Sequence, residues 1–331
     1  MHMSDALVSP AVGGLLWAGA AGVAAWSARR VDADGDERKV PLMGVLGAFV
    51  FAAQMVNFAI PGTGSSGHLG GGLLLAALLG PEAAFLVLAS VLGVQALFFA
   101  DGGLLALGAN AVNLGVPSAF VAYPLVFRRI LGRSRTRGRV VAASVSAAIV
   151  GLALGAALVA VETAASGISS LPLRSFLAVL VPIHLAIGAI EGLVTAAVLL
   201  VLWRARPELA DPAAPRRPVG RVALGVALAA LLTGGALSAL ASSRPDGLEW
   251  SASRVAGAEP AAPAGGVHAL VARVQAATAL LPGYALPGGR DGARGTSLSG
   301  VVGALLTLGV ALAGGAALRA FARRGRARMP R

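Results

Sequence analysis

The fold of this chain is decided by residues 174–203, RSFLAVLVPIHLAIGAIEGLVTAAVLLVLW, in which only Arg174, His184 and Glu191 are ionisable. A run of about 20 apolar residues suffices for a helix to cross the hydrocarbon core of a bilayer. Other runs of this kind occupy residues 10–29, 41–60, 82–100, 104–127, 140–162, 220–242 and 299–321. A further apolar run, 69–80, is too short to span a bilayer alone. The sequence therefore predicts an all-α polytopic membrane protein.

The composition of the 331 residues agrees with this prediction. Hydrophobic residues make up 56% and charged residues 13%, with a mean hydropathy of +0.79. An average soluble domain carries about 25% charged residues, so a water-soluble globular enzyme is excluded. The absence of cysteine excludes disulfides, thiolate metal sites and cysteine nucleophiles. Only 5% of residues are aromatic, which argues against a base-stacking surface and a nucleic-acid partner.

Basic residues indicate the orientation in the membrane. They gather in four segments, 29–40, 128–139, 204–221 and the tail from residue 319. Because Lys and Arg are enriched in cytoplasmic loops, all four are predicted to be cytoplasmic, with the N-terminus outside the cytoplasmic membrane and the C-terminus inside. This topology requires nine segments, with 69–80 and 82–100 crossing as a pair. The loop 61–68 must then dip into the protein.

The segment 204–221 is rich in proline and charge, and it separates seven apolar segments from two. We therefore expect a membrane domain at 1–206, a cytoplasmic linker at 207–218 and a two-helix domain at 219–331. Residues 243–298 are nearly neutral and rich in Gly, Pro and Ala, and they are predicted to form an external loop.

The N-terminus carries a candidate metal chelate. The first residues, MHMSDALVSP, lack the basic and apolar regions of a signal peptide, so the mature protein is expected to begin at Met1. The amine of Met1, the amide nitrogen of His2 and Nδ1 of His2 could then bind one ion. Nitrogen sites of this kind suit nickel, copper or cobalt. The alternative is an incidental histidine at an exposed terminus.

A fourth nitrogen could come from His68, in the glycine-rich stretch PGTGSSGHLGGG at 61–72. Ionisable groups at membrane depth are functional candidates, and this loop is predicted on the same side as His2. The alternative is a helix-entry loop whose histidine has only structural partners. The remaining His268 falls in the predicted external loop, where it is expected to play no part in metal binding.

Several polar residues interrupt the apolar runs, among them Asn57, Asn110, His184 and Glu191. They are expected to make hydrogen bonds between helices. Because His184 and Glu191 are two turns apart on one helix face, a proton relay is the alternative. The sequence contains no phosphate-binding Walker motif, no HExxH and no G-x-S-x-G, so the chain is not expected to be an enzyme. Any ATP hydrolysis would require another chain.

Four ordered motifs resemble the CbiM/NikM family over about residues 1–206. They are MHMSDAL at the terminus, PGTGSSGHLGGG at 61–72, ADGGLLALGANAVN at 100–113 and PIHLAIGAIEGLVTA at 182–196. Residues 219–321, with PDGLEW at 245–250, resemble the small CbiN/NikN or PDGLE-type auxiliary component, fused to the C-terminus. The family comprises the substrate-capture (S) membrane components of energy-coupling-factor importers for cobalt or nickel.

The resemblance implies a seven-segment S-component bundle followed by two transmembrane helices. It implies that Met1, His2 and His68 hold Ni²⁺ or Co²⁺ as the transported substrate. The residues expected to orient these ligands or to line the metal path are Asp5, Ser66, Asn57, Asn110, His184 and Glu191. The implied partners are a membrane T component (CbiQ/NikQ-like) and two ABC ATPase subunits (CbiO/NikO-like). Cobalt would serve cobalamin biosynthesis.

One departure and two rival functions accompany this resemblance. Met3 and Ser4 stand where many members have Ile-Pro, which leaves the terminal backbone less fixed. The first rival is a proton-coupled secondary metal transporter that uses His184 and Glu191. The second is a membrane-embedded enzyme, for which no catalytic motif is present.

Overall fold

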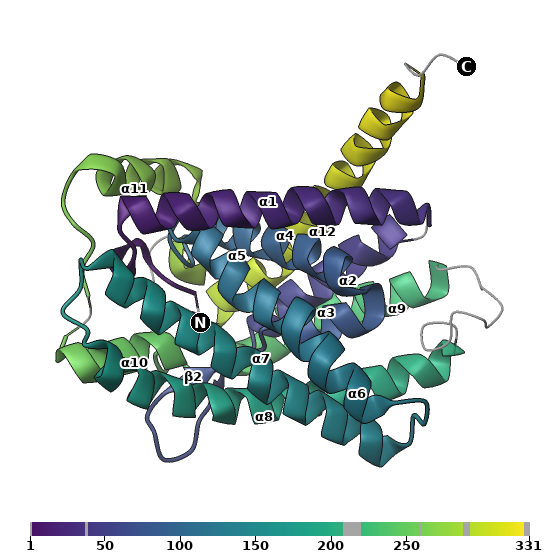
Figure 1. Ribbon diagram of the computed structural model, residues 1–331, viewed down its shortest axis with the longest axis horizontal. Helices are drawn as coiled ribbons and strands as arrows, with labels where there is room; N and C mark the ends of the chain where they lie inside the picture. Colours follow the sequence, from purple (N-terminus) through teal and green to yellow (C-terminus); the bar gives the residue numbers. More distant parts are fainter. Residues whose placement is uncertain (1, 37–38, 208–219, 259, 287–291, 328–331) are drawn as a thin grey trace.

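The computed structural model describes residues 2–36, 39–207, 220–258, 260–286 and 292–327 (Figure 1). The described residues are mostly helical. Their two strands, β1 (Phe58–Ala59) and β2 (Ser66–Gly67), form a small antiparallel pair. The predicted all-α fold class is therefore confirmed.

Seven of the described helical segments are long and apolar enough to cross a membrane. They are α1 (Pro10–Asp34), α4 (Pro81–Phe99), α5 (Leu107–Val116) with its continuation to Leu131, α7 (Arg137–Ser166), α8 (Leu173–Ala205), α9 (Gly220–Gly235) with its continuation to Leu240, and α12 (Gly292–Ala327).

Two predicted segments are shorter helices. The run 41–60 becomes α2 (Lys39–Gln54), which stops because the β1–β2 hairpin follows it. The run 69–80 becomes α3 (Gly72–Leu79), whose eight residues rise about 12 Å, too little to cross a bilayer. The hairpin and α3 together lead the chain into the bundle and back towards α4.

Glycines allow α8 to approach α7 closely. A Cβ atom added to Gly192 would lie 2.3 Å from Val145 Cα, and one added to Gly188 would lie 2.7 Å from Ile149 Cα. Small residues four apart are typical of close helix packing in membranes. This contact buries the inner face of α8, including His184 and Glu191, each 1% exposed.

The outer faces of the helices carry large apolar side chains. Leu15 on α1, Leu193 on α8 and Leu232 on α9 are 72%, 54% and 66% exposed. In a bilayer these side chains contact lipid tails instead of water.

Residues 243–298 are more ordered than the sequence predicted. They contain α10 (Gly247–Ala256), α11 (Gly266–Thr278) and a 3-10 turn at Pro282–Tyr284. Asp246 accepts from Leu248 N and Glu249 N, and the Glu249 side chain reaches back to the Asp246 N–H. This capping box was the sequence signal for a helix inside a Gly- and Ala-rich stretch.

The elements at one end of the bundle carry the candidate site. In Figure 1, α10, α11 and β2 lie at the left, whereas α6 (Arg128–Leu131) lies at the right. The arginines of α6 and the start of α7 therefore stand at the end away from His2 and His68. The predicted linker 207–218, apart from Pro207, lies outside the described residues.

Candidate metal centre

The N-terminal segment threads into the bundle before α1 begins. Met3 and Val8 are fully buried. The side chain of Asn110 on α5 accepts from Met3 N at 2.7 Å and donates to Met3 O at 3.1 Å. Asp5 accepts from the backbone N–H of Ala106 at 2.9 Å. These bonds fix the terminal backbone, which the sequence had predicted to be less fixed because the Ile-Pro pair is absent.

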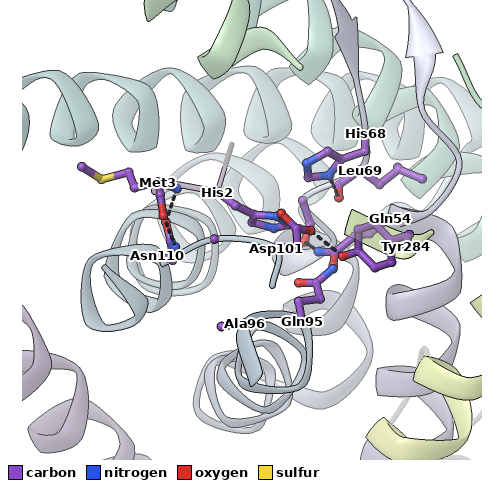
Figure 2. A network of polar contacts seen from close by, with 12 residues as sticks. His2, Met3, Gln54, His68, Leu69, Gln95, Ala96, Asp101, Asn110 and Tyr284 are labelled. Carbon is purple, nitrogen blue, oxygen red and sulfur yellow. Dashed lines mark hydrogen bonds and ion pairs between the residues drawn. The ribbon is translucent and has the colours of Figure 1, made fainter. Parts of the chain in front are cut away.

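His2 is held by a carboxylate. Its side chain is 5% exposed, and Nδ1 lies 2.9 Å from Oδ2 of Asp101, in the loop after α4 (Figure 2). Burial alone would raise the pKa of Asp101, but His2 and the phenol of Tyr284 lower it to about 2. The carboxylate is therefore ionised at neutral pH, and Nδ1 carries the proton of this bond. Nε2 of His2 is buried and has no hydrogen-bond partner among the residues that the structure describes.

His68 follows β2 and faces His2. The two ring centroids are 5.0 Å apart and the planes are tilted by 36°. Nδ1 of His68 lies 3.0 Å from the carbonyl oxygen of Leu69. A carbonyl only accepts, so Nδ1 holds the proton and Nε2 is the basic nitrogen. Burial, together with the nearby charge of His2, lowers the pKa of His68 to about 3, so the ring is neutral at pH 7.

Both rings line an open cavity of about 810 Å³ at this end of the molecule. Its polar lining includes Asp5, Asp101, Asp246 and Tyr284. In both rings Nδ1 lies against a carboxylate or a carbonyl. Histidines that ligate a metal almost always donate their second ring N–H to such a group. No group of three or more His, Cys, Asp or Glu side chains that could hold a metal occurs among the described residues.

The loop that carries His68 is anchored by α8. The carboxylate of Glu191 accepts from Gly70 N at 2.7 Å and from Gly71 N at 3.1 Å. Gln54 donates to Gly70 O at 2.9 Å and accepts from Gln95 at 2.8 Å. Gly71 has a φ of +79°, a conformation that favours glycine. Glu191 therefore shapes the backbone on which His68 stands.

The PDGLE segment lies along the other side of the same loop. Ser66 donates its N–H to Pro245 O at 2.8 Å, and its hydroxyl donates to Arg244 O at 2.8 Å. The carbonyl of Asn57 accepts from Ser242 N at 2.8 Å. Ser66, in the hairpin, and Asn57, just before it, thus both contact the C-terminal region.

The structure brings together His2, His68, Asp5, Ser66 and Asn57 at one end of the bundle, with Asn110 pinning the residue after His2. Met1 lies outside the described residues. His184 lines a second, small cavity together with His68, Gly70 and Asp246. Its Nδ1 donates to Leu180 O at 2.8 Å, and its Nε2 is buried with no hydrogen-bond partner among the described residues. The described bonds of His184 and Glu191 go to backbone groups and not to each other.

The sequence interpretation missed three contributors. They are Asp101 in the motif ADGG, Asp246 in the motif PDGLEW, and Tyr284 in the predicted external loop; all three line the cavity. An aspartate between a long apolar run and two glycines was the available signal for Asp101. His268, in the predicted external loop, packs against the N-terminal segment. It is 6% exposed, and its Nε2 lies 3.0 Å from Val8 O, so it tethers the N-terminal segment.

These observations define a multi-pass membrane protein with a histidine-lined pocket where its N-terminus enters the bundle. A family model described as "Cobalt uptake substrate-specific transmembrane region" (CbiM) matches residues 2–209, and the PDGLE domain matches residues 220–320. The chain belongs to the CbiM family, and it carries a PDGLE domain after the CbiM region.

Similar proteins agree with this membership. The chain is 33% identical over 352 residues to the "Fused nickel transport protein NikMN" of Rhodobacter capsulatus. The alignment covers 98% of this chain and 99% of that protein. It is 32% identical over 252 residues to the "Cobalt transport protein CbiM" of Geobacter sulfurreducens, 71% and 72% of the two chains. A crystal structure of a transition metal transporter matches with a TM-score of 0.55 and 30% identity, over 62% of this chain and 93% of that one.

Proposed function

We propose that this chain is the membrane component that captures Ni²⁺ or Co²⁺ in an energy-coupling-factor importer. The observation that carries this proposal is the convergence of the imidazoles of His2 and His68, each with Nδ1 on an acceptor. That arrangement leaves Nε2 of each ring as the nitrogen that a metal would bind, and any proton on that nitrogen would have to leave first.

The proposed ligands are the amine of Met1, His2 and His68. The chelate expected from the sequence uses Nδ1 of His2, because only Nδ1 can close a ring with the residue's own amide nitrogen. In the structure Nδ1 forms the bond with Asp101, whereas Nε2 is buried with no hydrogen-bond partner in the described part of the chain. Binding through Nε2 keeps every described contact of His2, so these contacts favour Nε2.

The proposed topology places this end outside the cytoplasmic membrane. The arginines of α6 and of the start of α7 lie at the opposite end of the bundle. They support this orientation, because basic residues are retained on the cytoplasmic side. The metal would enter the cavity from outside, and the chain would hand it across the membrane. A T component and two ABC ATPases, as the family resemblance implies, would supply the driving force.

Two measurements test the proposal. Protein purified with an unmodified N-terminus is expected to hold about one Ni²⁺ or Co²⁺ per chain by elemental analysis. Vesicles with this chain alone are expected to show no concentrative uptake, and uptake should require the T component, the ATPases and ATP. Proton-driven uptake by the chain alone would instead support a secondary transporter.

A further inference from the structure

The C-terminal region reaches the candidate site through the end of α4. The last carbonyls of a helix lack partners within the helix. Here the carbonyls of Ala96, Leu97 and Phe98 accept hydrogen bonds from Gln275, Thr278 and the backbone N–H groups of Leu280 and Leu281, at 2.8–3.2 Å. The end of α11 and the residues that follow it therefore cap the helix that leads into Asp101.

Tyr284 extends this contact to the residue that holds His2. Its hydroxyl donates to Oδ2 of Asp101, the same oxygen that accepts from His2 Nδ1 (Figure 2). The Tyr284 ring stacks on Phe99, with centroids 5.1 Å apart. Burial and the charge of Asp101 raise the pKa of this phenol well above its ordinary value, so the hydroxyl keeps its proton and donates.

The backbone is strained on both sides of this bond. Among the described residues, the non-glycine residues with positive φ are Ala100, at 52°, and Tyr284, at 62°. Left-handed backbone is unfavourable for residues with a Cβ atom and is retained where the surroundings impose it, often at functional sites. One of these residues precedes Asp101, and the other donates to it.

We propose that Tyr284 is a positioning residue of the metal site: it fixes Asp101, and through Asp101 it fixes the His2 ring. The PDGLE region thereby takes part in setting how tightly the N-terminal site holds its metal. This inference rests on the proposed function, because it requires His2 to be a ligand.

The test uses the full chain with a free N-terminus, purified in detergent, and Ni²⁺ as the probe. Tyr284→Phe removes the hydroxyl and keeps the ring on Phe99, so the fold is expected to persist in a thermal melt. Loss of a group that orients a metal-ligating histidine typically weakens metal affinity by about 10- to 100-fold. We expect that loss in equilibrium titration, together with a changed absorption spectrum of bound Ni²⁺ because the His2 ring is reoriented.

Two control variants separate positioning from general stability. Tyr123→Phe alters the one other tyrosine of the chain, far along the sequence in the span that follows α5. Thr278→Val removes a different hydrogen bond of the same contact, the one to Leu97 O. Both are expected to bind Ni²⁺ within threefold of wild type, with an unchanged spectrum. If Thr278→Val matches Tyr284→Phe, the effect belongs to docking in general and the proposal is overturned.

Asp101→Ala examines the same pair from the other side. Since Tyr284 acts through Asp101, adding Tyr284→Phe to Asp101→Ala should cause no further loss of affinity. If Tyr284→Phe lowers Ni²⁺ affinity as much in the Asp101→Ala background as in wild type, the proposal is overturned.

His2→Ala separates the role of Tyr284 from the proposed function. If His2→Ala loses binding but Tyr284→Phe binds like wild type, only the role of Tyr284 fails. If His2→Ala itself binds like wild type, the proposed function fails.

Discussion

His2 and His68 place their imidazole rings with centroids 5.0 Å apart, one from the N-terminal segment and the other from the loop before α3. An imidazole nitrogen binds a late transition metal at about 2.0–2.1 Å, which puts the ring centroid roughly 3 Å from the ion. Two rings that share an ion at an angle of 90° or more therefore lie about 4.5–6 Å apart on that same bond length. The observed spacing falls within this interval without any movement of the backbone.

The two histidines are therefore expected to be indispensable to binding. His2→Ala and His68→Ala each remove one proposed nitrogen, and each should lower Ni²⁺ or Co²⁺ affinity by orders of magnitude. Equilibrium dialysis of the purified variants measures the loss, and a thermal melt confirms that each variant is folded. Normal metal binding by His68→Ala would refute the loop as a source of ligand.

Two further histidine variants serve as matched controls. His268 contacts the backbone of Val8 and not the two rings, so His268→Ala should cost far less affinity than His2→Ala. His184 donates to Leu180 O, one turn away on α8, so His184→Ala should mainly lower stability or slow metal passage. If His184→Ala alone abolished equilibrium binding, the inner face of α8 would hold the metal instead.

A second prediction concerns the free amine. If the nitrogen of Met1 is a ligand, a peptide tag placed before Met1 converts that amine into an amide and should abolish tight binding. The same tag at the C-terminus should leave the affinity unchanged, because α12 ends on the opposite side of the bundle from the N-terminal segment (Figure 1). Full affinity in the N-terminally tagged protein would remove Met1 from the site.

A third prediction separates a structural role of Glu191 from a proton relay. Glu191→Ala leaves the buried N–H groups of Gly70 and Gly71 without their acceptor, which costs about 1–3 kcal/mol for each unsatisfied group. The His68 loop should then shift, so that metal affinity and melting temperature both fall. Glu82→Gln, at the start of α4, is the control carboxylate and should change neither.

The relay hypothesis expects a different outcome for the same variant. A Glu191 that only carried protons could be removed without any change in equilibrium metal binding, while uptake would stop. Titration and vesicle uptake measured on one preparation of Glu191→Ala therefore decide between the two roles.

Much of the fold followed from local sequence patterns. Apolar length predicted each of the membrane helices, and the short run 69–80 correctly indicated a segment that does not span alone. The boundary of α2 was wrong because hydropathy does not distinguish a helix from the extended residues after Gln54. The helices in 243–298 were missed because an alanine- and glycine-rich stretch has little apolar periodicity, and only the capping box marked α10.

The site was predicted only as far as its ligand candidates. His2 and His68 stood out by their positions in the chain, but nothing local connects Asp101 with His2 or Tyr284 with Asp101. Those contacts join residues far apart in sequence, and they depend on how α4 and the C-terminal region pack. Glu191 was noticed for its spacing from His184, whereas its partners proved to be the backbone of the glycine-rich loop.

The last prediction concerns the acid sensitivity of the metal-free protein. Burial lowers the pKa of His68 from 6.5 to about 3. The His68 ring therefore binds a proton more weakly in the folded protein than in the unfolded chain. Between these two values the unfolded state binds more protons, and the free energy of unfolding falls as the pH falls. Stability from this group is complete above pH 6.5 and is lost progressively towards pH 3.

His68→Gln provides the comparison, since glutamine keeps a polar side chain that does not titrate. Because His68 is only partly buried, we expect wild type to lose about 1–2 kcal/mol more than His68→Gln on going from pH 7.5 to pH 5. Thermal or denaturant unfolding in one detergent, with chelator present, measures both proteins across this interval. The other titrating groups are common to both chains and cancel in the difference. Parallel stability profiles would show that the ring of His68 is open to protons in the folded protein.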